Sequence, residues 1–127
     1  MDLGIDGKAA LITGGAGGIG LAIAKQLADE GCRIVVCDIN REALNNLAED
    51  WLALECDVTS ESQVTELFET IVREMGGLDI LVNNAGLCIY ELVPDTSLEN
   101  WEKVQRINLT SAFMLSKLAL PHMNARG

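Results

Sequence analysis

Residues 13–20 read Thr13-Gly14-Gly15-Ala16-Gly17-Gly18-Ile19-Gly20. This stretch follows a short apolar run at 9–13, which predicts a buried strand, and opens an amphipathic run at 18–30, which predicts a helix. Two patterns are nested in it, G-x-G-x-x-G and T-G-x-x-x-G-x-G. A glycine-rich turn between a strand and a helix N-terminus is typical of dinucleotide binding, because backbone amides there can hold a pyrophosphate.

Each glycine of the turn has a separate physical task. Gly14 lets the chain leave the strand sharply, Gly18 leaves room for the pyrophosphate, and Gly20 lets the helix pack close to the sheet. Gly17 and Ile19 complete the predicted cofactor loop. No Lys-Ser or Lys-Thr pair follows, so the turn is not a nucleoside-triphosphate P-loop.

The rest of the chain repeats the alternation of apolar runs and amphipathic stretches. Further strands are predicted at 33–38, 51–57 and 79–83, and helices at 41–50, from 59 or 60 to 75, and from Thr96 past residue 118. The helix starts are marked by Asn40 and by two capping boxes, Ser60-x-x-Gln63 and Thr96-x-x-Glu99, and Pro121 is expected to kink the last turn.

Strands joined by helices predict an α/β fold with a parallel sheet covered on both faces. Right-handed crossovers give the strand order 3-2-1-4, which is half of a Rossmann-type doubly wound sheet. We therefore expect residues 1–127 to form one dinucleotide-binding domain, the N-terminal part of a larger fold without the strands that follow the fourth.

Charge and cysteine content narrow the function classes. The net charge of −10 disfavours nucleic acid and membrane partners, whose phosphates such a surface repels. The chain has no signal peptide and no apolar stretch long enough for a bilayer, so a cytoplasmic protein is expected. The four cysteines form no C-x-x-C pair, which predicts reduced core residues and no metal site; they are Cys32, Cys37, Cys56 and Cys88.

Four segments in register resemble the short-chain dehydrogenase/reductase family. They are the T-G-x-x-x-G-x-G turn, Asp57-Val58 after the third strand, Asn83-Asn84-Ala85-Gly86 after the fourth, and the helix from Trp101 to Asn108. The resemblance implies an oxidoreductase that moves a hydride between a nicotinamide cofactor and a small alcohol or carbonyl substrate. It further implies that Asp57 binds the adenine amino group and that the Val58 amide approaches the ring. Asn84, Ala85 and Gly86 would line the ribose and nicotinamide side, and Asn108 would be the catalytic asparagine.

Asp38, at the end of the second predicted strand, indicates which cofactor is bound. A carboxylate there can accept both ribose hydroxyls, and its charge repels a 2′-phosphate, so NAD is predicted over NADP. Ile39 beside it joins the predicted cofactor-binding set. No Lys or Arg lies in the glycine turn or in the two positions after Asp38, and Arg41 is the nearest. The alternative is that Asp38 only caps a helix.

The family's proton-donating Tyr-x-x-x-Lys pair has no match here. The only tyrosine, Tyr90, has Pro94 four positions on. We therefore expect this chain to supply the cofactor-binding half and to be inactive alone. The alternative is a non-catalytic NAD-binding module; a methyltransferase on a similar sheet would not explain Asn84 or Asn108. Without a fifth strand, 79–83 becomes an apolar sheet edge, which predicts self-association or a homo-oligomer.

Overall fold

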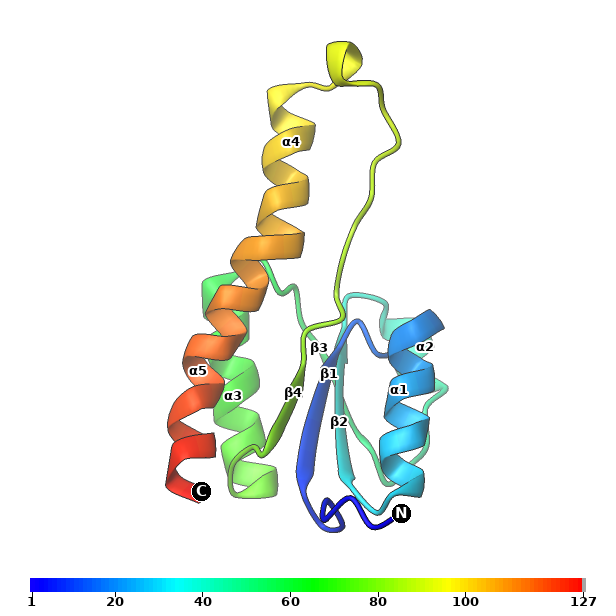
Figure 1. Cartoon of the computed structure of the whole chain (residues 1–127), viewed down its shortest axis with the longest axis vertical. Helices are drawn as coiled ribbons and strands as arrows, with labels where there is room; N and C mark the ends of the chain where they lie inside the picture. Colours follow the sequence, from blue (N-terminus) through cyan, green and yellow to red (C-terminus); the bar gives the residue numbers. More distant parts are fainter. Residues whose placement is uncertain (127) are drawn as a thin grey trace.

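The four apolar runs form one parallel sheet in the computed structural model, which describes residues 1–126. Its strands are β1 (Ala9–Thr13), β2 (Arg33–Asp38), β3 (Leu52–Glu55) and β4 (Ile80–Val82). All neighbouring pairs are parallel, and the order is β3-β2-β1-β4. The predicted order 3-2-1-4 is confirmed, and the carboxyl ends of the strands meet at one edge of the sheet (Figure 1).

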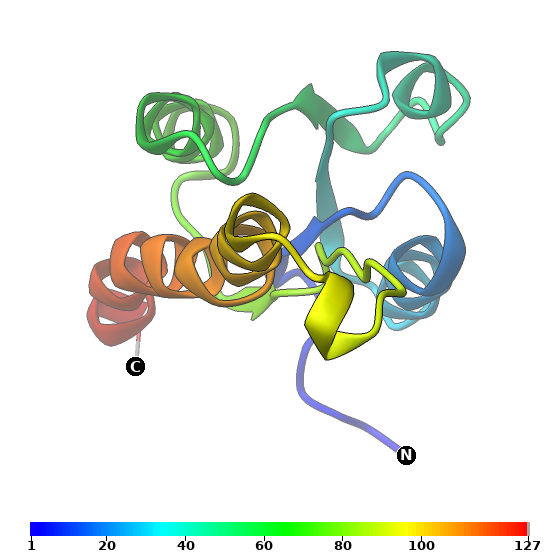
Figure 2. The same cartoon turned by 90° about the horizontal axis from the view of Figure 1, so that it is seen from above.

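Helices cover both faces of the sheet, as a parallel sheet requires. On one face lie α1 (Gly18–Asp29) and α2 (Arg41–Asn45), and on the other α3 (Glu61–Met75) and α5 (Ser111–Arg126) (Figures 1 and 2). The two-residue repeat of the strands sorts their side chains between two cores. Ala10 and Ile12 of β1 pack toward α1, whereas Ala9 and Leu11 pack in the core shared with α3 and α5.

The last helical region is longer than the sheet and contains one wide turn. It begins as α4 (Leu98–Gln105), passes through a π-helical turn, η2 (Arg106–Thr110), and continues as α5 through Pro121. A loop and a short 3-10 turn, η1 (Val93–Asp95), connect β4 to α4, and these elements rise beyond the carboxyl ends of the strands (Figure 1). A π-helical turn of this kind is frequent at functional sites.

Element boundaries are where the sequence predictions need correction. The strands predicted at 51–57 and 79–83 are shorter, Leu52–Glu55 and Ile80–Val82. The helix predicted over 41–50 ends at Asn45, because Asn46 closes it as the C-cap and the chain then turns. The cap of α4 is Ser97, whose Oγ accepts from the Asn100 N–H at 3.1 Å. The predicted cap, Thr96, instead donates its hydroxyl to the Leu92 carbonyl at 3.0 Å.

The capping box at Ser60 is half formed. Ser60 Oγ accepts from the Gln63 N–H at 3.4 Å, as predicted. The Gln63 Oε1 atom, however, accepts from the Asp57 N–H at 2.9 Å and not from Ser60. Gln63 therefore links the first turn of α3 to the segment that follows β3.

Within residues 1–126, none of the helices has the length and apolar character needed to cross a membrane.

Candidate cofactor-binding site

A cleft of about 350 Å³ opens at the carboxyl ends of the strands, beneath the rising loop and helix. In parallel α/β sheets this edge, where the strand order reverses, is where ligands bind. The predicted cofactor residues that line it are Asp38, Ile39, Asp57, Val58, Asn84, Ala85, Gly86 and Gly14. Cys37, Cys56, Thr59, Leu87 and Ile107 complete the lining.

The glycine turn has the backbone that its glycines predict. Gly14 and Gly18 have φ values of +62° and +55°, which favour glycine. A Cβ at Gly20 would lie 2.5 Å from the Gly14 carbonyl oxygen and would also collide with the Asn84 amide, so α1 packs as closely as predicted. At Gly17 and Gly18 a Cβ would meet nothing within 4 Å. The space beside these two glycines is open, as a phosphate cradle requires.

Thr13 and Asn84 hold the turn against the end of β4. The buried Thr13 Oγ1 accepts from the N–H groups of Asn84 and Ala85, at 3.0 and 2.9 Å. The Asn84 side-chain amide donates to the carbonyls of Thr13 and Gly14, at 3.0 and 3.2 Å. The motif in the sequence gives no role to the Thr13 hydroxyl, which here links the end of β1 to the residues that follow β4.

Asp38 faces the glycine turn across the lip of the cleft. Its Oδ2 accepts from the Ala16 N–H at 3.2 Å, and its Oδ1 accepts from the Asn40 N–H at 3.0 Å. The cap of α2 is Asn40, whose Oδ1 accepts from the Ala43 N–H at 3.1 Å. Asp38 is therefore not the helix cap, and the alternative reading of this residue is wrong.

Asp57 and Val58 follow β3 and line the cleft on the side next to Asp38. Asp57 Oδ1 accepts both from the Thr59 N–H, at 2.9 Å, and from the Thr59 hydroxyl, at 2.7 Å. These hydrogen bonds lower the pKa of Asp57, so the group is a carboxylate at neutral pH. Val58 is buried beside it and offers an apolar surface.

Asn108 lies in the π-helical turn and forms hydrogen bonds with the loop that follows Gly86. Its Oδ1 accepts from the Leu87 N–H at 2.7 Å, and its Nδ2 donates to the Leu87 carbonyl at 2.8 Å. Both ends of the side-chain amide are thus occupied by the backbone of one residue. A Cβ at Gly86 would lie 3.3 Å from Asn108 Oδ1, which leaves little room for a larger residue there.

The cysteines depart in part from expectation. Cys32, Cys37 and Cys56 are buried, but Cys88 is exposed on the rising loop, so the prediction of a core position for it is wrong. A hydrogen bond with Cys56 and burial raise the pKa of the Cys37 thiol on the floor of the cleft. His122 is half-buried and stacks on Phe68 with ring centroids 6.4 Å apart.

The sheet order, the helices on both faces and the glycine turn after the first strand define a Rossmann-type α/β protein. The family model described as short chain dehydrogenase matches residues 8–127, and the chain belongs to the short-chain dehydrogenase/reductase family. Members of this family are oxidoreductases that use nicotinamide cofactors and act on small molecules.

Several relatives resemble the chain closely over half of their own length. A short chain dehydrogenase/reductase of Colletotrichum higginsianum is 40% identical, over 94% of this chain and 48% of the relative. The 3-oxoacyl-[acyl-carrier-protein] reductase of Thermotoga maritima is 34% identical, over 94% of this chain and 51% of the relative. The structure of L-sorbose reductase from Gluconobacter frateurii, in complex with NADPH and L-sorbose, is 37% identical with a TM-score of 0.93, over 100% of this chain and 51% of that one. The chain spans about half the length of the curated relatives it matches.

Proposed function

We propose that this chain is the cofactor-binding half of an NAD(H)-dependent oxidoreductase acting on a small alcohol or carbonyl compound. The observation that carries the proposal is the place of Asp38. Its carboxylate stands at the end of β2, on the lip of the cleft, and is hydrogen-bonded to a glycine-turn amide. A ribose next to that turn would meet a negative acceptor, which suits free hydroxyls and repels a 2′-phosphate.

The glycine turn beside the cleft and the remaining lining residues would hold the other parts of the dinucleotide. The open space at Gly17 and Gly18 suits the pyrophosphate. The adenine ring would lie between Ile39 and Val58, with Asp57 accepting from its amino group. Asn84, Ala85 and Gly86 would continue the wall along the second ribose and the nicotinamide.

The bound cofactor would supply the hydride, and the residues of this chain would position the cofactor. Because both groups of the Asn108 side chain bond Leu87, we propose that Asn108 acts as a positioning residue for the nicotinamide side of the cleft. Residues 1–127 contain one tyrosine, Tyr90, which is 94% exposed on the rising loop. We propose that the group that protonates the forming alcohol is supplied from outside these residues.

Titrating the chain with NADH and NADPH, followed by nicotinamide fluorescence, tests the proposal. We expect NADH to bind at least tenfold more tightly than NADPH, and Asp38→Ala to remove most of that preference. Gly17→Ala should weaken both by roughly tenfold, since its methyl group enters the phosphate space, while the free energy of unfolding stays within about 1 kcal/mol of the parent's. Tighter binding of NADPH by the parent chain would overturn the cofactor assignment, and binding of neither would overturn the function.

NADH binding without carbonyl reduction would distinguish the proposed enzyme from its alternative. If the natural protein that contains this sequence binds NADH but reduces no carbonyl compound, the alternative of a non-catalytic NAD-binding module is correct.

A further inference from the structure

An ion pair next to Asp38 lies outside the lining of the cofactor cleft. Glu55 at the end of β3 is the register partner of Asp38 at the end of β2, so the two residues are neighbours at the carboxyl edge of the sheet. Arg41, the first residue of α2, places its Nε 2.6 Å and its terminal nitrogen 2.5 Å from the same Glu55 oxygen. The α2 start is itself tied to Asp38 through the Asn40 N–H at 3.0 Å.

Arg41 is the cation closest in sequence to Asp38; with Glu55 it lines a hollow beside the cofactor cleft and not the cleft itself. Guanidinium groups are well suited to phosphate, which they bind through paired N–H donors. The other arginine near the cleft, Arg106, is hydrogen-bonded to the Thr59 carbonyl at 2.6 Å, on the Asp57 side. The Arg41 side chain is 78% exposed, so packing does not hold it in place, and the Glu55 carboxylate is its hydrogen-bonding partner within the described residues.

We propose that Glu55 is a cofactor-specificity residue that acts through Arg41: it holds the guanidinium away from the adenosine ribose and so strengthens the preference for NAD over NADP. This inference rests on the proposed function. Three charges, Asp38, Glu55 and Arg41, meet at this corner with a net charge of −1. Removing the Glu55 charge brings that sum to zero and frees the guanidinium for a phosphate. The ribose hydroxyls of NAD gain little from the same change, because their partner remains Asp38.

The test compares NAD⁺ and NADP⁺ binding by calorimetry on the full chain and its variants. For Glu55→Gln we expect NADP⁺ to bind about fivefold more tightly, about 1 kcal/mol, with NAD⁺ affinity unchanged within about twofold, since exposed ion pairs are worth up to about that much. The double variant Glu55→Gln, Arg41→Gln should lose this gain. Raising the salt concentration from 0.05 to 0.5 M should also shrink it, because exposed charges are screened.

Glu42→Gln is the matched control. Glu42 lies on the same helix, is exposed and forms no ion pair among residues 1–126, so the variant removes the same charge without releasing Arg41. Its NADP⁺ to NAD⁺ affinity ratio should equal the parent's. The inference is overturned if Glu55→Gln leaves the ratio unchanged, if Glu42→Gln raises it equally, or if the double variant keeps the gain. A parent chain that binds neither dinucleotide overturns both the proposed function and this inference. If the parent prefers NAD⁺ but the Glu55 variant behaves like the parent, only this inference is overturned and the proposed function stands.

Discussion

At the residue scale, Thr13 does more for the site than its place in a motif suggests. Its hydroxyl is the acceptor for two backbone N–H groups, those of Asn84 and Ala85, and the side chain is 1% exposed. A β1 residue thereby sets the position of the chain where it leaves β4. The open turn at Gly17 and the acidic corner at Asp38 depend on that spacing.

Replacing Thr13 by valine should be costly, because the shape is kept while the acceptor is lost. The part-buried Ala85 N–H would then lack a partner, at a cost of about 1–3 kcal/mol, whereas the Asn84 N–H keeps the Val82 carbonyl at 3.0 Å. We expect Thr13→Val to lower the free energy of unfolding in urea by about 1–3 kcal/mol and to weaken NADH binding. Thr13→Ser keeps the oxygen and is the control; a valine variant as stable as the serine variant would show that the hydroxyl is not the anchor.

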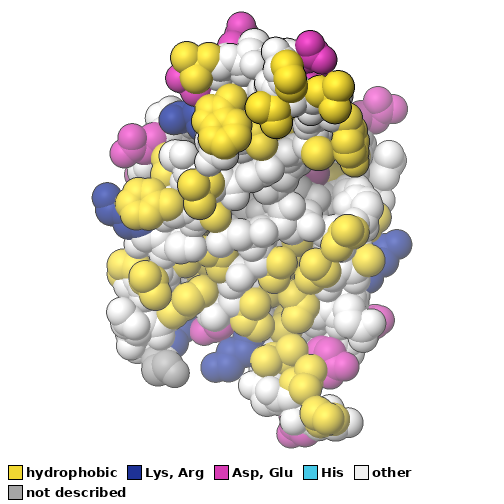
Figure 3. All heavy atoms as spheres, turned by 45° about the horizontal axis from the view of Figure 1, so that its top comes forward, with side chains coloured by type: hydrophobic (Ala, Val, Ile, Leu, Met, Phe, Trp, Pro, Cys, Tyr) yellow, Lys and Arg dark blue, Asp and Glu magenta, His cyan; other side chains and the backbone are white. Residues whose placement is uncertain are grey.

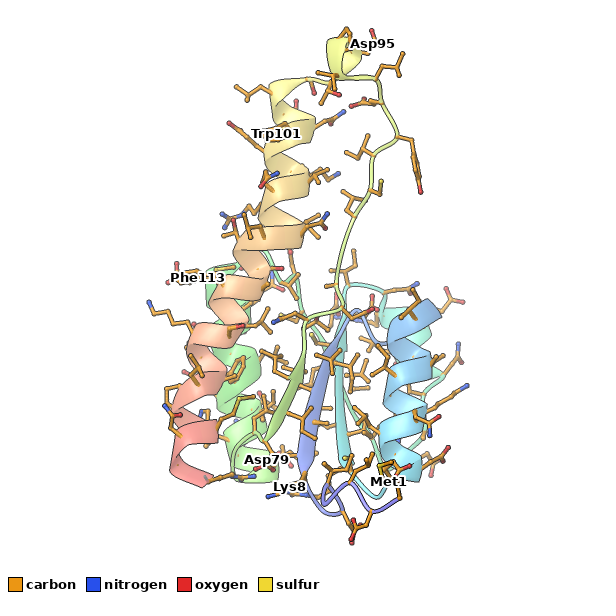
Figure 4. The ribbon with its side chains drawn as sticks, in the orientation of Figure 1. Met1, Lys8, Asp79, Asp95, Trp101 and Phe113 are labelled. Atoms are coloured by element: carbon orange, nitrogen blue, oxygen red, sulfur yellow. The ribbon has the colours of Figure 1, made fainter. Side chains whose placement is uncertain are left out.

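Asp79 gives the protein an acid-sensitive contact below the sheet, on the side away from the cleft (Figure 4). Burial alone raises its pKa, but hydrogen bonds from the Ala9 N–H, at 2.9 Å, and from Arg126, at 2.6 Å, lower the pKa below its usual value. A lowered folded-state pKa stabilises the protein above the unfolded-state value of about 3.9 and loses that contribution as the pH falls through the lowered value.

Asp79→Asn should therefore cost stability at pH 7 and progressively less in acid. We expect a loss of about 1–3 kcal/mol at neutral pH, because charge-assisted bonds to Asp79 are removed. The difference between the variant and the parent should shrink as the pH falls below about 4 and through the lowered pKa of Asp79, where the parent's own carboxyl becomes protonated. Urea unfolding at a series of pH values measures this, and a difference that is constant with pH would contradict the assigned contacts.

At the element scale, the sequence predicts what is local and misses what depends on the tertiary arrangement. The glycine turn could be predicted because a positive φ at Gly14 and an excluded Cβ at Gly20 are requirements of the nearby backbone. The start of α4 was misplaced by one residue because Thr96 and Ser97 are both good caps, and only the η1 turn decides that Thr96 bonds backward to Leu92. The Asn108–Leu87 pairing spans 21 residues and has no local signal.

The π-helical turn and the loop after β4 should behave as one unit, because Asn108 joins them. Asn108→Ala removes two exposed hydrogen bonds to Leu87, so we expect a modest stability loss of about 0.5–1.5 kcal/mol. The specific effect should be faster amide hydrogen exchange at Leu87, with unchanged exchange in the buried strand β1. Equal exchange at Leu87 in the parent and the variant would show that the loop is held by other contacts.

At the scale of the whole molecule, several large apolar side chains are exposed above the sheet, on the loop after β4 and on α4; they are Tyr90, Leu92, Val93, Leu98 and Trp101. Figure 3 shows hydrophobic side chains gathered at the upper end of the molecule and in a band below it. Figure 4 labels Trp101 on α4 and Phe113 on α5, and these residues are 58% and 65% exposed. In the sequence, Trp101 recurs at helical spacing with the apolar residues of the last helix. It is nevertheless exposed, because α4 extends beyond the sheet and the sheet does not cover it.

The edge strand β4 is a second surface through which two copies of the chain can associate. Among the described residues β4 pairs only with β1, so its other edge carries unpaired backbone groups, and its sequence Ile80-Leu81-Val82 has no charged residue to discourage another strand. We expect the isolated chain to self-associate, with a light-scattering mass that rises above 13.7 kDa as concentration increases.

The double variant Trp101→Lys, Phe113→Lys distinguishes the two surfaces. Association through the helices should be lost in this variant, whereas association through the edge of β4 should persist. A mass that stays monomeric at all concentrations would contradict both routes, and would mean that the charge of −10 outweighs the apolar surface and the open strand edge.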